Sequence, residues 1–379
     1  MRPRVFISLA TSNLGGPGKG LLQFLRSGGF ELCDPVIVDF VTESGCESEF
    51  ARVMRLSGAN VAELRQNRKF DMNLVDQAEN IVKREGCQIL QSHGYKSHVL
   101  CALLKRRIRL PWVAFVHGWT SENMKMQCYR IVEMGLVTLA TRVVAVSEAL
   151  GKRLPAIAQR KMTVIPNAVD PAELNDSSGR DVRHELGIPG EALVVGVVGR
   201  LSPEKGQIFF LKALAQTRQQ VPNAVGILLG DGQDRAMLEA EAARCGLTGA
   251  VFFTGHVSGL GDYYRAMDLV VMPSLSEGMP NVALEAMMFG KPVVASRVGG
   301  VPEVVVEGET GFMVTAGDAE SLAVALIRML ASPSRMQAMG EAGRRRALDN
   351  FSPTVRVDRL LALYKELLVA QTLEGNKNA

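Results

Sequence analysis

Short runs of apolar, β-branched residues alternate with segments of helical periodicity along nearly the whole chain. In the first half, the runs that predict strands are Val5–Leu9, Val36–Phe40, Ile89–Gln91, Trp112–Val116, Val143–Val146 and Thr163–Ile165. In the second half they are Leu193–Val198, Gly226–Leu229, Val251–Thr254, Leu269–Met272, Val293–Ser296 and Phe312–Val314. Because continuous apolar strands separated by helices are buried on both faces, this pattern predicts parallel sheets covered by helices.

The alternation is interrupted once, where turn-forming residues are frequent, at residues 171–192. We therefore predict an α/β fold of two tandem Rossmann-like, doubly wound domains, residues 1–170 and residues 193–353, joined by a linker at 171–192. With 379 residues, each domain is long enough for a full core. Helical periodicity dominates the C-terminal part, in the segments Ser321–Leu330, Arg335–Asn350 and Thr354–Val369.

The charge balance limits the classes of partner. The chain carries 43 Lys and Arg against 39 Asp and Glu, a net charge of +4. This excess suits an anionic substrate or an anionic membrane surface, and it is too small to indicate nucleic-acid binding. No apolar run approaches the ~18–20 residues of a membrane span. The N-terminal apolar stretch is too short for a signal peptide, so we interpret it as the first buried strand.

The cysteines lie at long, irregular spacings, with neither a CxxC pair nor a zinc-like Cys/His pattern: Cys33, Cys46, Cys87, Cys101, Cys128 and Cys245. This usage is typical of thiols in a reducing cytosol. Five of them lie within the first 128 residues, so one disulfide stays an alternative.

In doubly wound folds, ligands bind beyond the carboxyl ends of the strands, so the loops there hold the candidate site. After the first predicted strand, Gly15 and Gly16 precede an apolar helix, an arrangement in which backbone amides can contact phosphate. The glycine spacing fits neither a P-loop nor a dinucleotide fingerprint, which also weakens Asp39 as a ribose-binding acid. A merely tight strand–helix turn is the alternative.

Three side chains at other strand ends are candidates for chemistry. His117 follows the strand Trp112–Val116, and a structural role is its alternative. Arg200 and Lys205 follow the strand Leu193–Val198, where two cations match the charge of a diphosphate. A solvated loop is the alternative for this pair.

The segment that begins at Pro273 is the most informative in the chain. Glu277 ends a loop after a buried strand, and Glu285 follows eight residues later within the helix Val282–Phe289. We expect amides from Gly278 to Val282 and the two carboxylates to face a polyhydroxylated ligand. A general acid/base pair is the competing interpretation of the carboxylates, and a helix cap is the structural alternative for Glu277.

The order and spacing of these residues resemble the bacterial GT-B, family 4 retaining glycosyltransferases. The matching segments are Gly15-Gly16, Val146–Glu148, Pro166–Asp170, Arg200 with Lys205, Thr254–Val257, Glu277 with Glu285, and Gly299–Glu303. The resemblance covers most of the chain and is strongest from 193 to 315. Gly94–Lys96 and His117–Thr120 are similar to members that build cell-surface polysaccharides, such as lipopolysaccharide and exopolysaccharide.

The resemblance implies a role for each matching residue. Arg200 and Lys205 would bind the donor diphosphate, Gly15 and Gly16 would contact phosphate from the first domain, and His117 would line the donor-sugar pocket near the acceptor. The other implied donor-binding residues are His256 and Val257 at the base, Glu277, Gly278, Met279, Pro280 and Asn281 at the sugar, and Glu285 at the ribose. The family's final helix commonly crosses back onto the first domain, a role for residues 354–372. Met279 and Ala168 depart from the usual residues, which leaves substrate detail open.

The reaction implied is transfer of a hexose from a nucleotide-diphosphate sugar to a glycan or lipid-linked acceptor, with the anomeric configuration retained. Arg200, Lys205, Glu277 and His117 are the candidate catalytic residues. We expect no metal and no cofactor, because two cations can stabilise the leaving diphosphate. We also expect the site to lie between the two domains and the donor to close them.

Three other functions stay open on the sequence. A sugar-nucleotide epimerase would isomerise the donor without using an acceptor. A nicotinamide-dependent oxidoreductase is opposed by the broken glycine fingerprint. A non-catalytic nucleotide-sugar binder would show no turnover.

We expect a cytoplasmic protein. Two basic stretches, Leu103–Leu110 and Arg65, Arg68 and Lys69, are candidates for peripheral binding to the anionic inner face of the plasma membrane, with solvated helix ends as the alternative.

Overall fold

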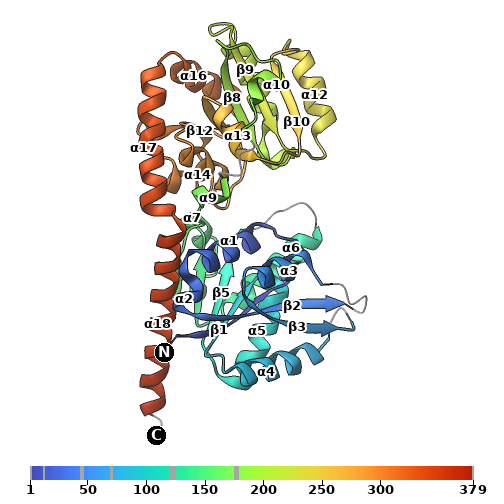
Figure 1. Cartoon of the computed structure of the whole chain (residues 1–379), viewed down its shortest axis with the longest axis vertical. Helices are drawn as coiled ribbons and strands as arrows, with labels where there is room; N and C mark the ends of the chain where they lie inside the picture. Colours follow the sequence, from blue (N-terminus) through green and yellow to red (C-terminus); the bar gives the residue numbers. More distant parts are fainter. Residues whose placement is uncertain are drawn as a thin grey trace. The chain divides into compact units, whose positions relative to one another are not determined.

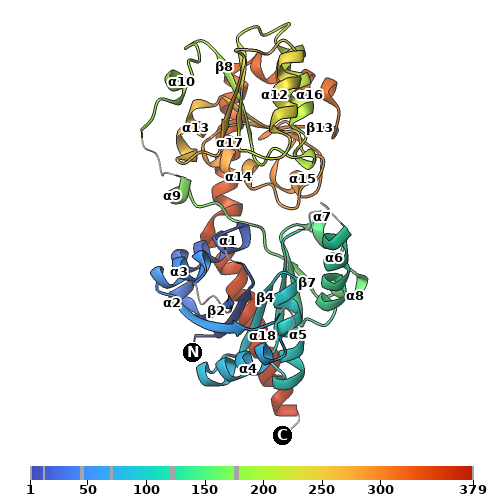
Figure 2. The same cartoon turned by 90° about the vertical axis from the view of Figure 1, so that its right-hand side faces the viewer.

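The computed structural model divides the chain into two compact units, residues 1–168 together with 353–379, and residues 169–352 (Figure 1). It describes residues 2–11, 13–42, 47–68, 71–118, 124–174 and 179–377. Each unit is built on one parallel sheet flanked by helices (Figure 2). The α/β fold class with two Rossmann-like sheets is therefore confirmed.

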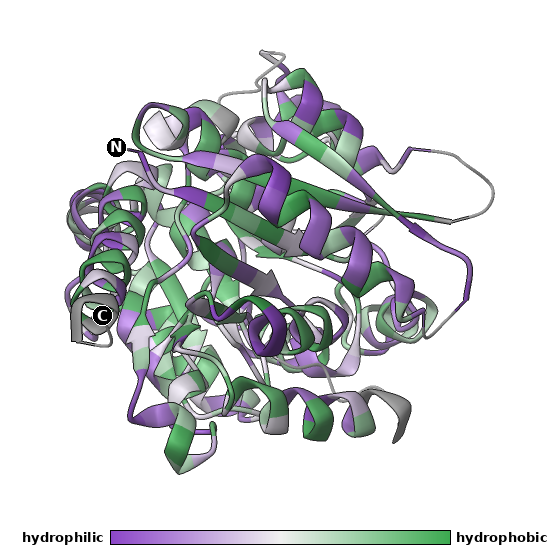
Figure 3. Cartoon of the chain, turned by 90° about the horizontal axis from the view of Figure 1, so that it is seen from below, coloured by the Kyte–Doolittle hydropathy of each residue, from purple (hydrophilic) through white to green (hydrophobic). Residues whose placement is uncertain are grey.

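The first unit holds a seven-stranded sheet in the order β3-β2-β1-β4-β5-β6-β7. Its strands are β1 (Arg4–Leu9), β2 (Asp34–Thr42), β3 (Asn60–Gln66), β4 (Ile89–His93), β5 (Trp112–Val116), β6 (Arg142–Ala145) and β7 (Met162–Val164). The central strands β4 and β5 are buried along their whole length. Figure 3 shows the hydrophobic strands inside and hydrophilic residues on the outward sides of the helices.

Strand β3 was missed because its sequence, NVAELRQ, is largely polar and only Leu64 in it is buried. It is an edge strand that pairs only with β2 in the sheet order. An edge strand is solvated on one side, so it does not need the apolar run by which buried strands are recognised.

The helices of the first unit include a long C-terminal one that returns to it from the end of the chain. They are α1 (Gly16–Phe24), the π-helical segment Leu25–Gly29, α2 (Phe30–Leu32), α3 (Glu49–Leu56), α4 (Asn73–Glu85), α5 (Tyr95–Ile108), α6 (Met124–Val137), α7 (Glu148–Gly151), α8 (Ala156–Gln159) and α18 (Pro353–Lys377). Helices α1, α3 and α18 share a core with β1, in which Phe50 and Tyr364 are fully buried. Residues 353–379 thus belong with the first unit.

The second unit holds a six-stranded sheet in the order β10-β9-β8-β11-β12-β13. Its strands are β8 (Leu193–Val198), β9 (Ala224–Leu229), β10 (Val251–Gly255), β11 (Leu269–Met272), β12 (Val293–Ser296) and β13 (Gly311–Val314). Its helices are α9 (Pro171–Leu174), α10 (Val182–Glu185), the 3-10 turn Pro203–Lys205, α11 (Gln207–Thr217), α12 (Arg235–Arg244), α13 (Leu260–Ala266), α14 (Asn281–Met288), α15 (Val301–Val304), α16 (Ala319–Leu330) and α17 (Pro333–Phe351).

Residues 171–192 were expected to be a linker, but the structure counts them with the second unit. Two short helices, α9 and α10, form there. Val182 is buried, and Arg183 donates to the carbonyl oxygen of Ala266 at 2.9 Å and pairs with Asp268 at 2.9 Å. These contacts attach α10 to α13 and to Asp268, the residue before β11, which polar composition alone does not reveal.

The cysteines that the structure describes are free thiols, so they form no disulfide with one another. Burial raises the pKa of Cys33 and of Cys87 to about 12. Cys46 lies outside the described residues. Across the described chain, every helix falls short of the length and apolar character required to cross a membrane.

Candidate functional site

The strand order of each sheet reverses at one point, between β1 and β4 in the first unit and between β8 and β11 in the second. Loops leave in opposite directions on the two sides of such a point, which opens a crevice at the carboxyl ends of the strands. Gly15 follows β1, Arg200 follows β8 and Glu277 follows β11. The structure therefore places these candidates at the topological switch points.

Lys205 and Glu277 come together in the second unit, although 72 positions separate them in the sequence. The Nζ atom of Lys205 donates to Oε1 of Glu277 at 2.8 Å, and the Glu277 side chain is only 8% exposed. Ser274 Oγ donates to the same oxygen at 2.7 Å. A cation and a hydroxyl donor thus both bind this buried carboxylate oxygen, which satisfies its hydrogen-bonding capacity.

Two glycines allow the backbones around this pair to approach. A Cβ on Gly206, whose φ is +65°, would lie 2.2 Å from the carbonyl oxygen of Pro273. A Cβ on Gly299, whose φ is +49°, would lie 1.7 Å from the carbonyl oxygen of Glu277. The amide of Gly300 also donates to the carbonyl of Gly278 at 3.2 Å. The loop after β12 therefore supports the backbone that carries Glu277.

Arg200 lies on the same loop as Lys205 and forms an ion pair of 2.9 Å with Glu204. Together with His256 and Val257 it lines a pocket of about 650 Å³ at the carboxyl ends of β8, β9 and β10. The structure thus brings together three residues that were expected to bind the donor. Lys205 and Glu277 are not among the residues that line this pocket.

Asp231 lines the same pocket and was missed. A hydrogen bond from the amide of Gly232, 2.8 Å long, lowers the pKa of its carboxyl group, and the charge of Arg235 adds to the effect. The signal was the sequence Gly230-Asp231-Gly232 directly after a buried strand, the position that made Arg200 a candidate.

The turn before α14 is only partly as expected. Pro280 is the N-cap residue of the helix, and the Met279 side chain is 8% exposed. The amide of Asn281 donates to the carbonyl of Met279 at 3.0 Å, so this amide, expected to face a ligand, is engaged within the turn. Gly278 lies between Glu277 and the buried Met279 and accepts the bond from Gly300.

Glu285, on α14, accepts a hydrogen bond of 2.6 Å from the hydroxyl of Tyr264. Tyr264 is fully buried on α13 and stacks on Phe289 with ring centroids 5.2 Å apart. Burial raises the pKa of Tyr264 well above its ordinary value, and the carboxylate of Glu285 adds to the effect. Tyr264 was not a candidate, yet it fixes the orientation of one.

The first unit has a pocket of about 350 Å³ at the carboxyl ends of β1, β4 and β5. Gly15 lines it at the start of α1, and in the described part of the chain no side chain caps this N-terminus. A Cβ on Gly15 or on Gly16 would meet nothing within 4 Å. The uncapped amides and the positive end of the helix dipole suit an anion.

His117 lines this pocket and hydrogen-bonds to a second histidine that was missed. The Nε2 atom of His117 lies 2.8 Å from Nδ1 of His93, and the two rings stack with centroids 5.1 Å apart. Burial lowers the pKa of His117 to about 3, and the positive charge of Arg356 on α18 contributes. The predicted strand ended at Gln91, two residues before His93, so only the longer strand β4 of the structure brings His93 beside His117.

Three pocket side chains on helices were also not site candidates: Tyr95, Tyr129 and Arg130. Tyr95 and Tyr129 stack with ring centroids 4.2 Å apart and an interplanar angle of 7°. Arg130 lines the pocket, and its buried Nε atom has no hydrogen-bond partner among the described residues. Trp119 and Thr120, which belong to the predicted motif, lie outside the described residues.

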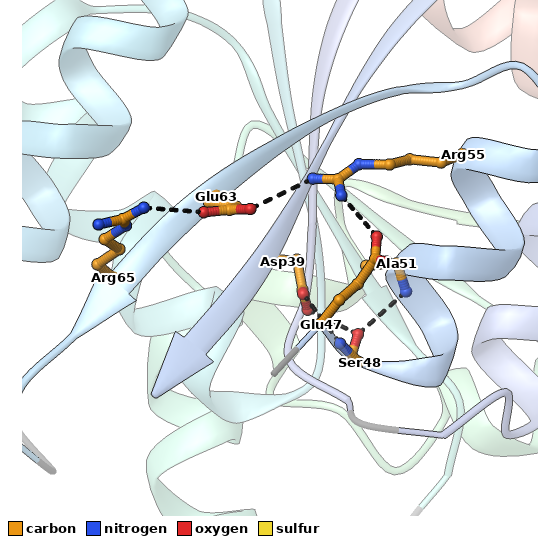
Figure 4. Close-up of polar contacts among 7 residues, drawn as sticks. All are labelled: Asp39, Glu47, Ser48, Ala51, Arg55, Glu63 and Arg65. Carbon is orange, nitrogen blue, oxygen red and sulfur yellow. Dashed lines mark hydrogen bonds and ion pairs between the residues drawn. The ribbon is translucent and has the colours of Figure 1, made fainter. Parts of the chain in front are cut away.

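Asp39 is not available to a ligand. It is 2% exposed and accepts a hydrogen bond of 2.8 Å from the hydroxyl of Ser48, which caps α3 by accepting from the amide of Ala51 at 3.0 Å (Figure 4). Beside it, Arg55 pairs with Glu47 at 2.6 Å and with Glu63 at 3.5 Å. The cluster is structural, which agrees with the weak glycine fingerprint.

Two other segments of the predicted motifs, Val146–Glu148 and Pro166–Asp170, contain residues that stabilise the local backbone. Ser147 is the N-cap of α7 and accepts from the amide of Leu150 at 3.2 Å. Asp170 accepts from the amide of Ala172 at 2.8 Å. Within the described ranges, no group of three or more His, Cys, Asp or Glu side chains is placed to hold a metal ion.

Comparisons with known proteins agree with this geometry. A family model described as "Glycosyl transferases group 1" matches residues 179–346, and one described as "Glycosyltransferase Family 4" matches residues 35–173. A D-inositol 3-phosphate glycosyltransferase of Segniliparus rotundus is 32% identical over 74% of this chain and 66% of the relative. A "UDP-Gal:alpha-D-GlcNAc-diphosphoundecaprenol alpha-1,3-galactosyltransferase" of Escherichia coli is 27% identical over 79% of this chain and 80% of the relative.

Among solved structures, HepE of Anabaena in complex with UDP has a TM-score of 0.81 and 24% identity, and the match covers 98% of this chain and 100% of that one. This likeness supports the fold. The two family models and the curated relatives show that the chain belongs to the GT-B, family 4 glycosyltransferases.

Proposed function

We propose that this protein transfers a hexose from a nucleotide-diphosphate sugar to a glycan or lipid-linked acceptor in cell-surface polysaccharide synthesis. The anomeric configuration is retained, and neither a metal ion nor another cofactor takes part. The observation that carries the proposal is the pair at the switch point of the second unit, where Nζ of Lys205 lies 2.8 Å from Oε1 of Glu277. An ammonium suits a diphosphate, and a carboxylate beside it suits sugar hydroxyls.

The negative charge of the leaving diphosphate explains why two cations, Arg200 and Lys205, lie in the site. When the bond from the anomeric carbon to the phosphate oxygen breaks, the electron pair leaves with the diphosphate. Arg200 and Lys205 stabilise that charge, and each such donor contributes about 10²–10³ in rate. The acceptor oxygen forms the new bond on the face that the diphosphate leaves, and its proton goes to the departing phosphate. Glu277 and Glu285 bind sugar and ribose hydroxyls instead of moving protons.

The decisive experiment is kinetic. Lys205→Ala and Arg200→Ala are each expected to lower kcat about 10²–10³-fold at saturating donor. Lys212→Ala, a lysine of α11 in the same unit, is the matched control and is expected to keep wild-type kcat. Near-normal kcat in either site variant would contradict the leaving-group role. Isomerised donor with no acceptor consumed would instead identify an epimerase.

Product analysis tests retention of the anomeric configuration, and chelation tests metal independence. An α-linked product from an α-linked donor, observed by NMR, supports retention, and a β-linked product contradicts it. Activity that persists in EDTA supports metal independence. A thermal-shift screen with uridine, guanosine and adenosine diphosphate sugars identifies the base that the pocket beside Asp231 and His256 accepts.

The pocket of the first unit supports a sugar acceptor that carries a phosphate. The stacked rings of Tyr95 and Tyr129 offer an aromatic face, and Arg130 offers a cation whose buried Nε atom has no partner in the part of the chain that the structure describes. The E. coli relative is named for an acceptor that is linked through a diphosphate to undecaprenol. Arg130→Ala is expected to raise the acceptor KM about tenfold and to leave donor affinity unchanged. An unchanged acceptor KM would contradict this assignment. Gly15, Gly16 and His117 as contacts of the donor stay predictions.

Peripheral binding to the inner face of the plasma membrane is part of the proposal, on a surface other than the two basic stretches expected. In the stretch Leu103–Leu110, Lys105 donates to the carbonyl of Leu139 at 2.7 Å, and Arg107 pairs with Asp76 and Glu79. In the other stretch, Lys69 lies outside the described residues.

A second surface combines exposed apolar and basic side chains. Ile131, Leu139 and Ile157 are 67%, 46% and 62% exposed, and the exposed cations Lys152, Arg153 and Arg160 flank α8. Lys161 donates to the carbonyl of Thr138 at 2.6 Å, which holds the segment after α6 beside the segment after α8. Such a surface suits anionic lipid. Co-sedimentation with anionic vesicles at low salt, lost in an Ile131→Asp/Ile157→Asp variant, is the expected result, and absence of wild-type binding would contradict it.

A further inference from the structure

A chain of buried polar side chains connects the C-terminal helix with the pocket of the first unit. The hydroxyl of Tyr364 on α18 donates to Oε1 of Gln91 on β4. The Nε2 atom of Gln91 lies 2.9 Å from Nε2 of His93, and Nδ1 of His93 lies 2.8 Å from Nε2 of His117. Tyr364, Gln91 and His93 are 0%, 2% and 4% exposed. The links from Tyr364 to His93 are therefore shielded from bulk water, whereas His117, at the end of the chain of bonds, is half-buried.

The orientation of the Gln91 amide in the structure sets the direction of every bond. The oxygen of an amide accepts and its nitrogen donates. Since Tyr364 donates to the oxygen of Gln91, the amide nitrogen faces His93, and Nε2 of His93 accepts. A neutral imidazole carries one hydrogen, so that of His93 is on Nδ1 and is donated to His117. In turn, Nε2 of His117 accepts, and the hydrogen of His117 is on Nδ1.

The imidazole rings of His93 and His117 are neutral, because their buried surroundings disfavour the charged form. Burial lowers the pKa of His93 well below its ordinary value, and the charges of His117 and Arg356 add to the effect. Burial lowers the pKa of His117 as well, again with Arg356 contributing. At neutral pH both rings therefore carry a single hydrogen.

We infer that Tyr364 and Gln91 are positioning residues that hold His117 as the Nδ1–H tautomer, so that His117 presents a hydrogen-bond donor to an oxygen of the ligand in the first unit's pocket. His117 lines that pocket beside Gly94 and Tyr95. Its Nε2 atom is occupied by His93, and in the described parts of the chain no group accepts from its Nδ1 atom. Nδ1 is thus the ring nitrogen left for a ligand.

The tautomer has a mechanistic consequence, which rests on the proposed function for the identity of the ligand. A ring nitrogen that carries hydrogen cannot take a proton from an acceptor hydroxyl, so His117 is not the general base at Nδ1. It binds a sugar oxygen instead. The proton of the acceptor hydroxyl then has to go elsewhere, as it does in the proposed transfer to the leaving phosphate.

The test reads the tautomer directly. The full chain contains five histidines, so their ¹⁵N-labelled imidazoles can be assigned one at a time by His→Gln substitution in long-range ¹H–¹⁵N spectra. At pH 7 the wild type is expected to show a single Nδ1–H tautomer for His117. Tyr364→Phe and Gln91→Met remove the orienting bonds at similar volume, and both are expected to convert that signal into a mixture of tautomers. Ser8→Ala is the control, because the buried Ser8 hydroxyl on β1 makes no hydrogen bond.

An Nε2–H signal for His117 in the wild type would overturn the inference, and so would the same single tautomer in both variants as in the wild type. If Gln91→Met fails to fold, Tyr364→Phe decides on the same criterion. In transfer assays, each variant is expected to lose about tenfold in kcat/KM, equivalent to one hydrogen bond. A wild type with the Nδ1–H tautomer but no transferase activity would leave this inference standing and refute the proposed function.

Discussion

Gly299→Ala is expected to damage the second unit through one contact. The added Cβ would lie 1.7 Å from the carbonyl oxygen of Glu277, and the φ of +49° already disfavours a side chain. Neither the Glu277 backbone nor the Gly299 backbone can move alone, because the Gly300 amide is bonded to the Gly278 carbonyl at 3.2 Å. The substitution therefore has to displace the loop that carries Glu277.

The loss of stability in Gly299→Ala can be calibrated against a matched glycine. Gly308 also has a positive φ, +76°, but a Cβ there would meet nothing within 4 Å. Gly308→Ala therefore carries only the left-handed strain of about 1–2 kcal/mol. Gly299→Ala carries a similar strain plus the cost of forced overpacking, about 1–3 kcal/mol. The difference corresponds to a further fall of about 2–12 °C in Tm for a domain of this size.

Thermal and urea unfolding of both variants, with nucleotide-sugar titration, measure the effect. Gly299→Ala is expected to be the less stable and to lose donor affinity, whereas Gly308→Ala keeps wild-type affinity. If the two variants have equal free energies of unfolding, the backbone contact at Glu277 does not have the importance assigned to it.

Two further predictions concern the first unit. Burial lowers the pKa of His93 and His117, so below pH ~6.5 the unfolded chain takes up protons that the folded chain does not. The contribution of these histidines to the free energy of unfolding is therefore constant above that pH. Below it, the free energy of unfolding falls by up to about 1.4 kcal/mol per pH unit for each histidine. Urea titrations from pH 7.5 to 5 check this, and a slope that stays the same in His117→Gln would refute it. Ser48→Ala removes the cap of α3 and a donor to the buried Asp39, so it is expected to cost about 1 kcal/mol, whereas Ser48→Thr retains the oxygen and most of the stability; equal losses in the two variants would contradict the capping role.

Most of the fold could be predicted because buried strands leave a strong signal. The runs Trp112–Val116 and Val293–Ser296 are strands over those same residues in the structure. The signal failed at β3, which is polar and lies at the edge, and at residues 171–192, where contacts from Arg183 outweigh a turn-rich composition.

For the candidate site, sequence spacing predicted where loops end but not which side chains meet. Arg200, Lys205 and Glu277 were recognised because charged residues follow buried strands. That Lys205 pairs with Glu277 while Arg200 pairs with Glu204 could not be read from spacing, since both glutamates lie within reach of a long, flexible cation. Tyr264 and His93 were missed because a buried tyrosine or histidine has the same sequence signature as ordinary core.

By itself, the sequence determined the class of fold, the two-fold repetition of the sheet and the loops in which chemistry is carried. Periodicity and strand-end glycines are local properties, so they can be recognised in the amino-acid sequence without the fold. The direction of the hydrogen bonds through Tyr364, Gln91 and His93 to His117 was decided by the tertiary structure alone. It depends on α18 packing a residue 273 positions away against β4, and the orientation of an amide exists only once both of its partners are in place.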